Sequence, residues 1–199
     1  MKRKVLAIIF VCCTLVLGAQ DAIRVGYQGT APTISDLAWA FLCSFDNDEE
    51  ECGDKPTNAI KQAWVNRRDG LPQDDGVTLT VDEKNGYVLY EFIYHDVVDR
   101  MEMCYWNEAD GKHRLFAFNN LATMQNGKPV VTETSGMMFY RYNNATKKMT
   151  YCAPPGFDVE YDCTYALPSS GKDITVTRWN EDGTKQEKTL KWNGHKFSF

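Results

Sequence analysis

Histidine is scarce in this chain of 199 residues, which contains three: His95, His113 and His195. No His-Glu-x-x-His or Cys-x-x-Cys spacing occurs, so the usual zinc signatures are absent. The Gly-x-Ser-x-Gly elbow and the Gly-x-x-x-x-Gly-Lys-Ser/Thr loop are missing too. These absences disfavour zinc enzymes, elbow-type serine hydrolases and phosphate-loop nucleotide binders, and we expect neither a metal nor a cofactor.

Long apolar runs are also lacking beyond the amino-terminal segment. Lys2, Arg3 and Lys4 precede an apolar stretch over 5–17, which the small residues Gly18 and Ala19 follow. A basic start, a short apolar run and a small-residue end are typical of a secretory signal. A transmembrane helix needs about 20 apolar residues, and Gln20-Asp21 cut this run short. The sequence therefore predicts a signal peptide over 1–19 and an exported protein, periplasmic, at the cell surface or extracellular, with no transmembrane segment after signal removal.

Basic residues are outnumbered in the remaining chain. Without the three basic residues of the signal, 19 Lys and Arg stand against 27 Asp and Glu, a net charge near −8. An acidic surface repels phosphate backbones, so nucleic acid is disfavoured as a partner. The length of 20–199 suits a single domain with one core.

Five cysteines remain in that domain, an odd number that leaves at least one thiol outside any intramolecular pair. Cys43 and Cys52 bracket a polar loop, and Cys152 and Cys163 bracket a Pro-Pro-Gly turn. We expect these two pairs to form disulfides. Cys104 would remain, as a small buried residue of a strand.

A hairpin pattern recurs three times at intervals of roughly 36 residues. Each copy has an aromatic strand end, then Asn, a short polar turn and a Lys: 105–112, 140–147 and 178–185. Asn and Asp-Gly in these positions tolerate the positive φ of tight hairpin turns. The most conspicuous motif of the sequence therefore has a structural explanation.

Helical spacing precedes these repeats. Apolar residues over 34–42 predict a first amphipathic helix, with Ser35 or Asp36 as its cap, and a second helix runs from near Thr57 to Gly70. From Gly76 the apolar pattern alternates with period two. The fold class we predict is α+β and β-rich: two short N-terminal helices (about 34–70) followed by an antiparallel hairpin meander (about 76–199) as an open twisted sheet, sandwich or partial barrel.

Four segments (81–88, 115–119, 154–156 and 190–197) resemble small secreted or envelope proteins of Bacteroidetes that have no assigned function. The likeness covers much of the chain from about Ala59 to Phe197. It implies an exported protein of a Gram-negative cell and brings no catalytic motif with it.

Three groups of residues could bear chemistry, and each has a simpler interpretation. The acidic run 46–51 offers oxygen ligands for calcium, but Glu51 stands where an EF-hand-like loop has Gly, and a solvated loop is favoured. Cys104 and His113 could form a nucleophile and base, but the expected hairpin register, with Cys104 opposite Ala117, separates them by about 13 Å. His95, Asp96, Asp99 and Glu102 could hold zinc or a general base, although only one of them is a histidine.

Aromatic residues near the turns are the candidates for ligand binding. Exposed Trp and Tyr rings beside Asn and Asp can stack on sugars or anchor a protein. The leading hypothesis is a non-catalytic binding or interaction module for a glycan, a peptide or an envelope protein. Alternatives are a hydrolase of an envelope or dietary polymer that uses paired carboxylates such as Asp96 and Asp99, and a structural subunit of an envelope assembly. The predicted ligand-binding residues are Trp106, Tyr140, Tyr142, Trp179 and Trp192.

Overall fold

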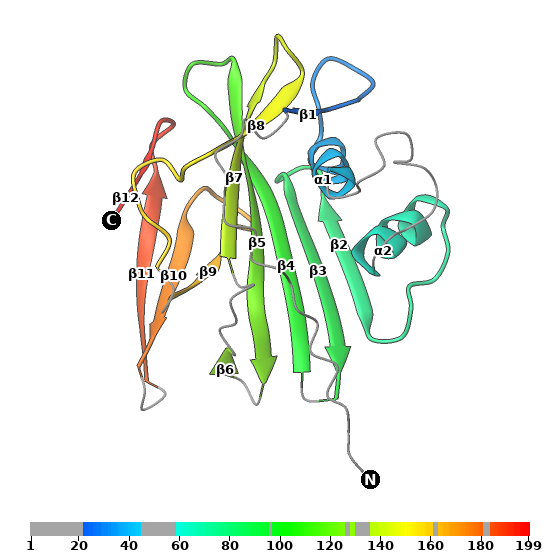
Figure 1. Ribbon diagram of the computed structural model, residues 1–199, viewed down its shortest axis with the longest axis vertical. Helices are drawn as coiled ribbons and strands as arrows, with labels where there is room; N and C mark the ends of the chain where they lie inside the picture. The colour runs from blue at the N-terminus through cyan, green and yellow to red at the C-terminus, as the bar shows by residue number, and fades with distance from the viewer. Residues whose placement is uncertain are drawn as a thin grey trace.

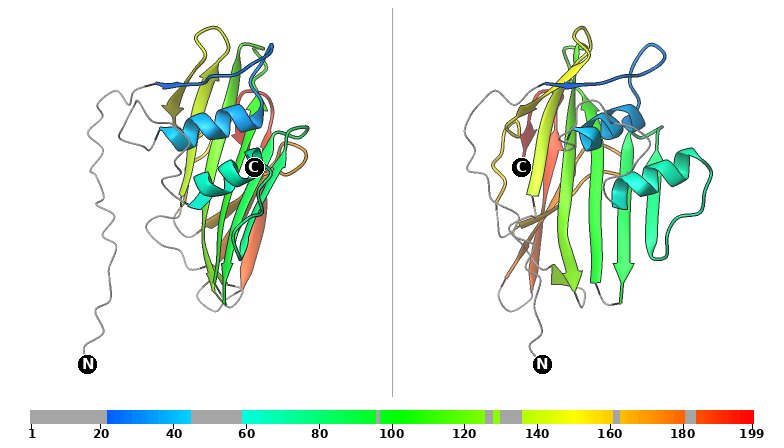
Figure 2. Two further views of the ribbon diagram at one scale, coloured as in Figure 1. Left: turned by 90° about the vertical axis from the view of Figure 1, so that its right-hand side faces the viewer. Right: turned by 45° about the vertical axis from the view of Figure 1, so that its right-hand side comes forward.

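The computed structural model describes residues 22–44, 59–95, 97–125, 128–129, 136–160, 163–180 and 184–199. Within these residues, two helices and two antiparallel sheets form three layers (Figures 1 and 2). The helices cover one face of the larger sheet, and the smaller sheet packs against the opposite face. The β-rich, antiparallel character predicted from the sequence is confirmed.

The larger sheet follows a path of seven strands, in the order β1-β8-β7-β5-β4-β3-β2, with β6 paired to β5 off this path. The path curls into a half-barrel. From β2 to β5 each strand pairs with the next one along the chain, as expected for a meander. Its strands are β1 (Ile23–Arg24), β2 (Val77–Asp82), β3 (Tyr87–Tyr94), β4 (Val97–Asn107), β5 (His113–Gln125), β6 (Lys128–Pro129), β7 (Gly136–Asn143) and β8 (Lys148–Cys152).

The smaller sheet contains four strands in the order β12-β11-β10-β9. The meander predicted over 76–199 is therefore divided between two sheets. The division falls after β8, where the Pro-Pro-Gly segment 154–156 leads away from the larger sheet. Its strands are β9 (Cys163–Ala166), β10 (Ile174–Trp179), β11 (Lys185–Trp192) and β12 (Phe197–Ser198).

Two helices lie between β1 and β2: α1 (Ile34–Cys43) and α2 (Ala59–Arg68). Thr33 is the N-cap of α1, in place of the predicted Ser35 or Asp36, because its side chain accepts the Asp36 amide while the Asp36 carboxylate accepts the Thr33 amide at 2.7 Å. This reciprocal pair is a capping box. After α2, Gly70 takes a φ of +67°, which lets the chain turn back. The helices do not open the fold, because β1 precedes them and pairs with β8.

The three recurring turns join β4 to β5, β7 to β8 and β10 to β11. Cys104 lies opposite Ala117, which is the register expected from a turn centred on Asp110-Gly111. Gly111 and Lys147 take the positive φ values that tight turns require, 66° and 55°. The repeated motif is therefore a set of hairpin ends.

Alternate side chains of the central strands pack in two separate hydrophobic cores. Val88, Tyr90, Met103 and Phe116 face the helices, where Phe41 of α1 packs on Phe116 with ring centroids 5.4 Å apart. The residues between them face the smaller sheet and meet its apolar side chains. Both faces of the larger sheet are thus covered over its central strands.

Candidate functional site

A groove of about 540 Å³ lies on the helix side of the molecule. Figure 2 shows α1 and α2 side by side on the same face of the larger sheet. Small-molecule sites typically occupy about 300–1,000 Å³, so the groove can hold a ligand of one or two sugar rings. It is lined by Gly26, Ser35, Asp36, Trp39, Trp64, Val65, Arg67 and Arg68.

Helical spacing places these side chains along the groove. Ser35, Asp36 and Trp39 belong to adjacent turns of α1, and Trp64, Arg67 and Arg68 follow i, i+3, i+4 spacing on α2. Trp39 is half-buried and packs against the helix-side core, whereas Trp64 belongs to that core. The groove therefore joins two indole rings to polar and cationic groups.

The polar side chains of the groove differ in the hydrogen bonds and ion pairs that they form with other residues. The Asp36 carboxylate accepts hydrogen bonds from the Thr33 amide and the Thr33 hydroxyl, and Ser35 donates to Glu83. Arg68 forms an ion pair with Asp69 at 2.8 Å. Arg67, by contrast, forms no ion pair with any residue that the structure describes.

The five predicted ligand-binding aromatic residues do not share one exposed face in the structure. Tyr140 and Tyr142 lie in the helix-side core, and Trp106 and Trp192 lie in the core between the sheets, each at most 8% exposed. Trp179 remains partly exposed, donates to Thr164 Oγ1 at 3.1 Å and lies under Lys185. The prediction treated proximity to turns as exposure, but both sheet faces are covered close to those turns.

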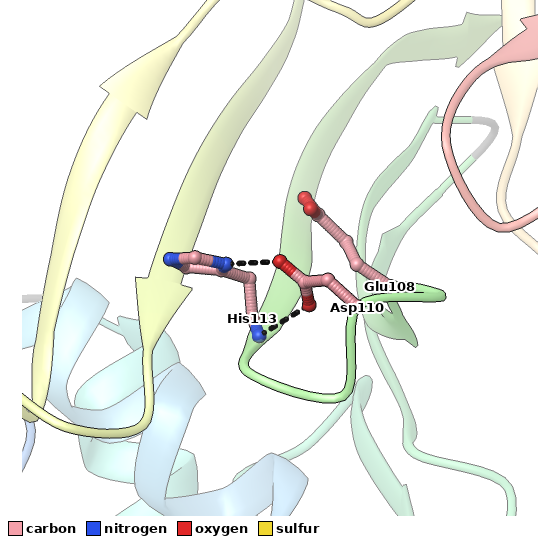
Figure 3. A group of neighbouring side chains, drawn as sticks. All are labelled: Glu108, Asp110 and His113. Atoms are coloured by element: carbon pink, nitrogen blue, oxygen red, sulfur yellow. Dashed lines mark hydrogen bonds and ion pairs between the residues drawn. The ribbon is translucent and has the colours of Figure 1, made fainter.

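A second polar group lies at the β4–β5 turn, where Glu108, Asp110 and His113 converge (Figure 3). Their potential metal-ligating atoms lie within 4.8 Å of one another. Asp110 Oδ1 accepts the amides of Lys112 and His113, and its Oδ2 lies 2.5 Å from His113 Nδ1. Glu108 Oε1 accepts from Arg141 Nε at 2.7 Å.

The hydrogen bonds around Asn143 define the tautomer of His113. Asn143 Oδ1 accepts the amides of Ala145 and Thr146, so its Nδ2 is the atom that faces His113 Nε2 at 2.9 Å. An amide nitrogen donates, so Nε2 accepts and Nδ1 carries the proton that is directed to Asp110. Both ring nitrogens are therefore engaged.

These bonds make the group a clasp between two hairpin ends. Asn144 adds hydrogen bonds to the carbonyls of Lys112 and Gly111. A metal ion bound between these three side chains would have to replace the proton that His113 Nδ1 directs to Asp110. The arrangement therefore favours a structural role at the end of the larger sheet.

The clasp predicts an acid-sensitive Asp110. The hydrogen bond from His113, followed by that from the Lys112 amide, lowers the pKa of Asp110 from 3.8 to about 2. A lowered carboxyl pKa favours the folded state above pH 4, and this contribution is lost as the pH falls from about 4 to 2. In a carboxyl NMR titration we expect a midpoint near 2 for Asp110 and a higher midpoint in His113→Ala, which loses the side-chain hydrogen bond and keeps the two amide hydrogen bonds. A midpoint near 3.8 in the unmodified protein would show that the clasp is not formed in solution.

The other sequence candidates have different outcomes. Cys104 is buried, and burial raises the pKa of its thiol well above the usual value. Cys104 pairs with Ala117, and in this register its thiol and the His113 ring lie apart along the strands. Glu102, grouped by sequence with His95, Asp96 and Asp99, is 1% exposed and points away from the helices into the inter-sheet core. Asp96 and the acidic run 46–51 lie outside the described residues.

The expected disulfide between Cys152 and Cys163 is absent. Cys152 ends β8 opposite Phe139 in the larger sheet, whereas Cys163 begins β9 opposite Arg178 in the smaller one. The two cysteines belong to different layers, and both pack against the core between them. Cys43 ends α1, and its predicted partner Cys52 lies outside the described residues, so that bridge stays a prediction.

Comparisons give no relative from which a function could be transferred. No protein-family model matches the sequence, and no similar curated protein or solved structure was found. Among the described residues, no helix combines the length and the apolar composition needed to cross a membrane.

Proposed function

We propose that this protein is an exported, non-catalytic binding module that holds a glycan in the groove between α1 and α2. Export rests on the signal-like residues 1–19. The observation that carries the ligand proposal is the presence of Trp39 and Trp64 in one groove, together with the polar side chains of Ser35 and Arg67. Indole rings present flat apolar surfaces on which the C–H faces of sugar rings can pack.

The small number of carboxylates in the groove favours binding over hydrolysis. Glycoside hydrolysis generally uses two carboxyl groups on opposite sides of the scissile bond. Asp36 is the one carboxylate among the described residues that line the groove, and it already accepts two hydrogen bonds from Thr33. The described groove walls thus combine two aromatic rings, which bind without reacting, with a single carboxylate.

Removing the half-buried ring is the direct test of this proposal. We expect Trp39→Ala to weaken glycan binding at least about tenfold, because one stacking surface is lost. The measurement is isothermal titration calorimetry against neutral hexoses, amino sugars and uronic acids. Circular dichroism and a melting curve check that the variant folds.

Trp179→Ala is the matched control, since Trp179 lies on β10 in the smaller sheet. It should bind each sugar as the unmodified protein does. Failure of every sugar to bind, or equal loss of affinity in Trp39→Ala and Trp179→Ala, would contradict a glycan site in this groove.

A further inference from the structure

We infer that the glycan bound in this groove carries a carboxylate, held by Arg67. The inference rests on the proposed function and adds the charge of the ligand to it. It follows from the hydrogen-bond donors of the groove that have no acceptor among the described residues.

Arg67 is the first such donor. It lies in the last turn of α2, is exposed and lines the groove. Its neighbour Arg68 is matched by Asp69, with Nε at 2.8 Å and Nη2 at 3.3 Å from the two carboxylate oxygens. Arg67 has no such acidic partner among the described residues. Its planar guanidinium can therefore form a bidentate pair with an incoming carboxylate.

Trp64 is the second donor. Its indole N–H is buried, and no described residue accepts a hydrogen bond from it. A buried donor without an acceptor is unfavourable, and most such donors in proteins are satisfied. Trp64 and Arg67 are one helical turn apart on α2 and line the same groove. Neither donor has an acceptor among the described residues, and the exposed guanidinium of Arg67 is the one that the oxygens of a ligand in the groove can reach.

The opposite wall limits the charge of that ligand. Asp36 on α1 is acidic, and one arginine of the groove is already neutralised by Asp69. A monoanionic carboxylate is balanced by Arg67 alone. A phosphate close to two negative charges would be repelled by Asp36. The groove thus favours a uronic acid over a neutral sugar and over a sugar phosphate.

The test compares glucuronate, glucose and glucose 6-phosphate on the full protein by calorimetry at constant ionic strength. We expect glucuronate to bind at least about tenfold more tightly than glucose, since a charge-assisted pair is gained. Arg67→Gln should remove that preference for glucuronate over glucose. Lys191→Gln, which removes an equal charge from exposed β11, should leave the preference intact.

The outcomes separate this inference from the proposed function. Equal binding of glucose and glucuronate, or an unchanged preference in Arg67→Gln, would overturn the carboxylate and leave the glycan site standing. Tightest binding of glucose 6-phosphate would also overturn it. Binding of none of the three sugars would overturn both proposals.

Discussion

Replacing Glu102 by alanine is expected to lower the free energy of unfolding by about 3–5 kcal/mol. Glu102 Oε1 accepts from the Tyr87 hydroxyl at 2.8 Å and from Arg100 at 3.1 Å, and Oε2 accepts from Asn119 at 3.2 Å and from the Leu167 amide at 2.8 Å. The substitution leaves the Tyr87 hydroxyl and the Leu167 amide without this acceptor in the core and removes one of the two acceptors of Asn119. An uncompensated buried charge or donor costs more than the bond itself contributes.

The large effect follows from where the network lies. Tyr87, Glu102 and Asn119 come from three strands of the larger sheet, and Leu167 directly follows β9 of the smaller one. Asn119 also donates to the Tyr165 carbonyl at 2.6 Å. Glu102 and Asn119 therefore join the two sheets through hydrogen bonds within a mainly apolar core.

Urea unfolding followed by circular dichroism and tryptophan fluorescence measures this prediction. Glu187→Ala is the matched control, because Glu187 lies on β11 with its side chain half exposed and should change stability by about 0.5 kcal/mol or less. A loss below about 1 kcal/mol in Glu102→Ala would show that the two sheets are held together without this network.

Trp106→Ala is expected to destabilise the protein by about 3–5 kcal/mol. The Trp106 ring packs between Phe139 of the larger sheet and Trp192 and Phe197 of the smaller one, and its N–H donates to the Lys172 carbonyl at 2.8 Å. Truncation removes this contact area and leaves a cavity in the inter-sheet core. The same urea experiment gives the loss of unfolding free energy.

Trp179→Ala provides the comparison, because Trp179 is partly exposed at a corresponding hairpin end. We expect a loss below about 1 kcal/mol. Equal losses for Trp106→Ala and Trp179→Ala would mean that Trp106 is not a core residue, and the hypothesis of an exposed aromatic face would regain support.

The hairpins could be predicted from the sequence because their signals are local. Asp110-Gly111 defines the centre of the β4–β5 turn, and pairing outward from it places Cys104 opposite Ala117, as the structure has it. Period-two alternation also places side chains two residues apart on one face of a strand, and Val88 and Tyr90 do lie in one core. Turn chemistry and period-two alternation both act within a few residues.

Predicting that these aromatic residues are buried requires a second sequence signal besides the alternation of apolar and polar residues. The segments 87–90, 101–106 and 115–118 are apolar at nearly every position, a pattern typical of strands covered on both faces. Given that pattern, Trp106 belongs to one core and Tyr105 packs against the other. The single charge in the middle segment, Glu102, marks the hydrogen-bonded junction between the sheets.

The groove could not be predicted because its two walls are distant in sequence. Trp64 is buried in the second helix that the sequence predicts, but nothing local places Trp39 of α1 beside Arg67 of α2. That proximity depends on how both helices pack on the larger sheet, through Phe41 and Ala63 among others. That Arg67 has no acidic partner among the described residues is likewise visible only in the folded structure.

The most direct test of the central claim is to follow the five tryptophan indole N–H signals by ¹⁵N NMR while glucuronate is added to the protein. Binding in the groove predicts that the signals of Trp39 and Trp64 shift with ligand concentration and saturate, while those of Trp106, Trp179 and Trp192 stay in place. A saturating shift of Trp179 with Trp39 and Trp64 unchanged, or no shift of any signal, would contradict a ligand site between the two helices.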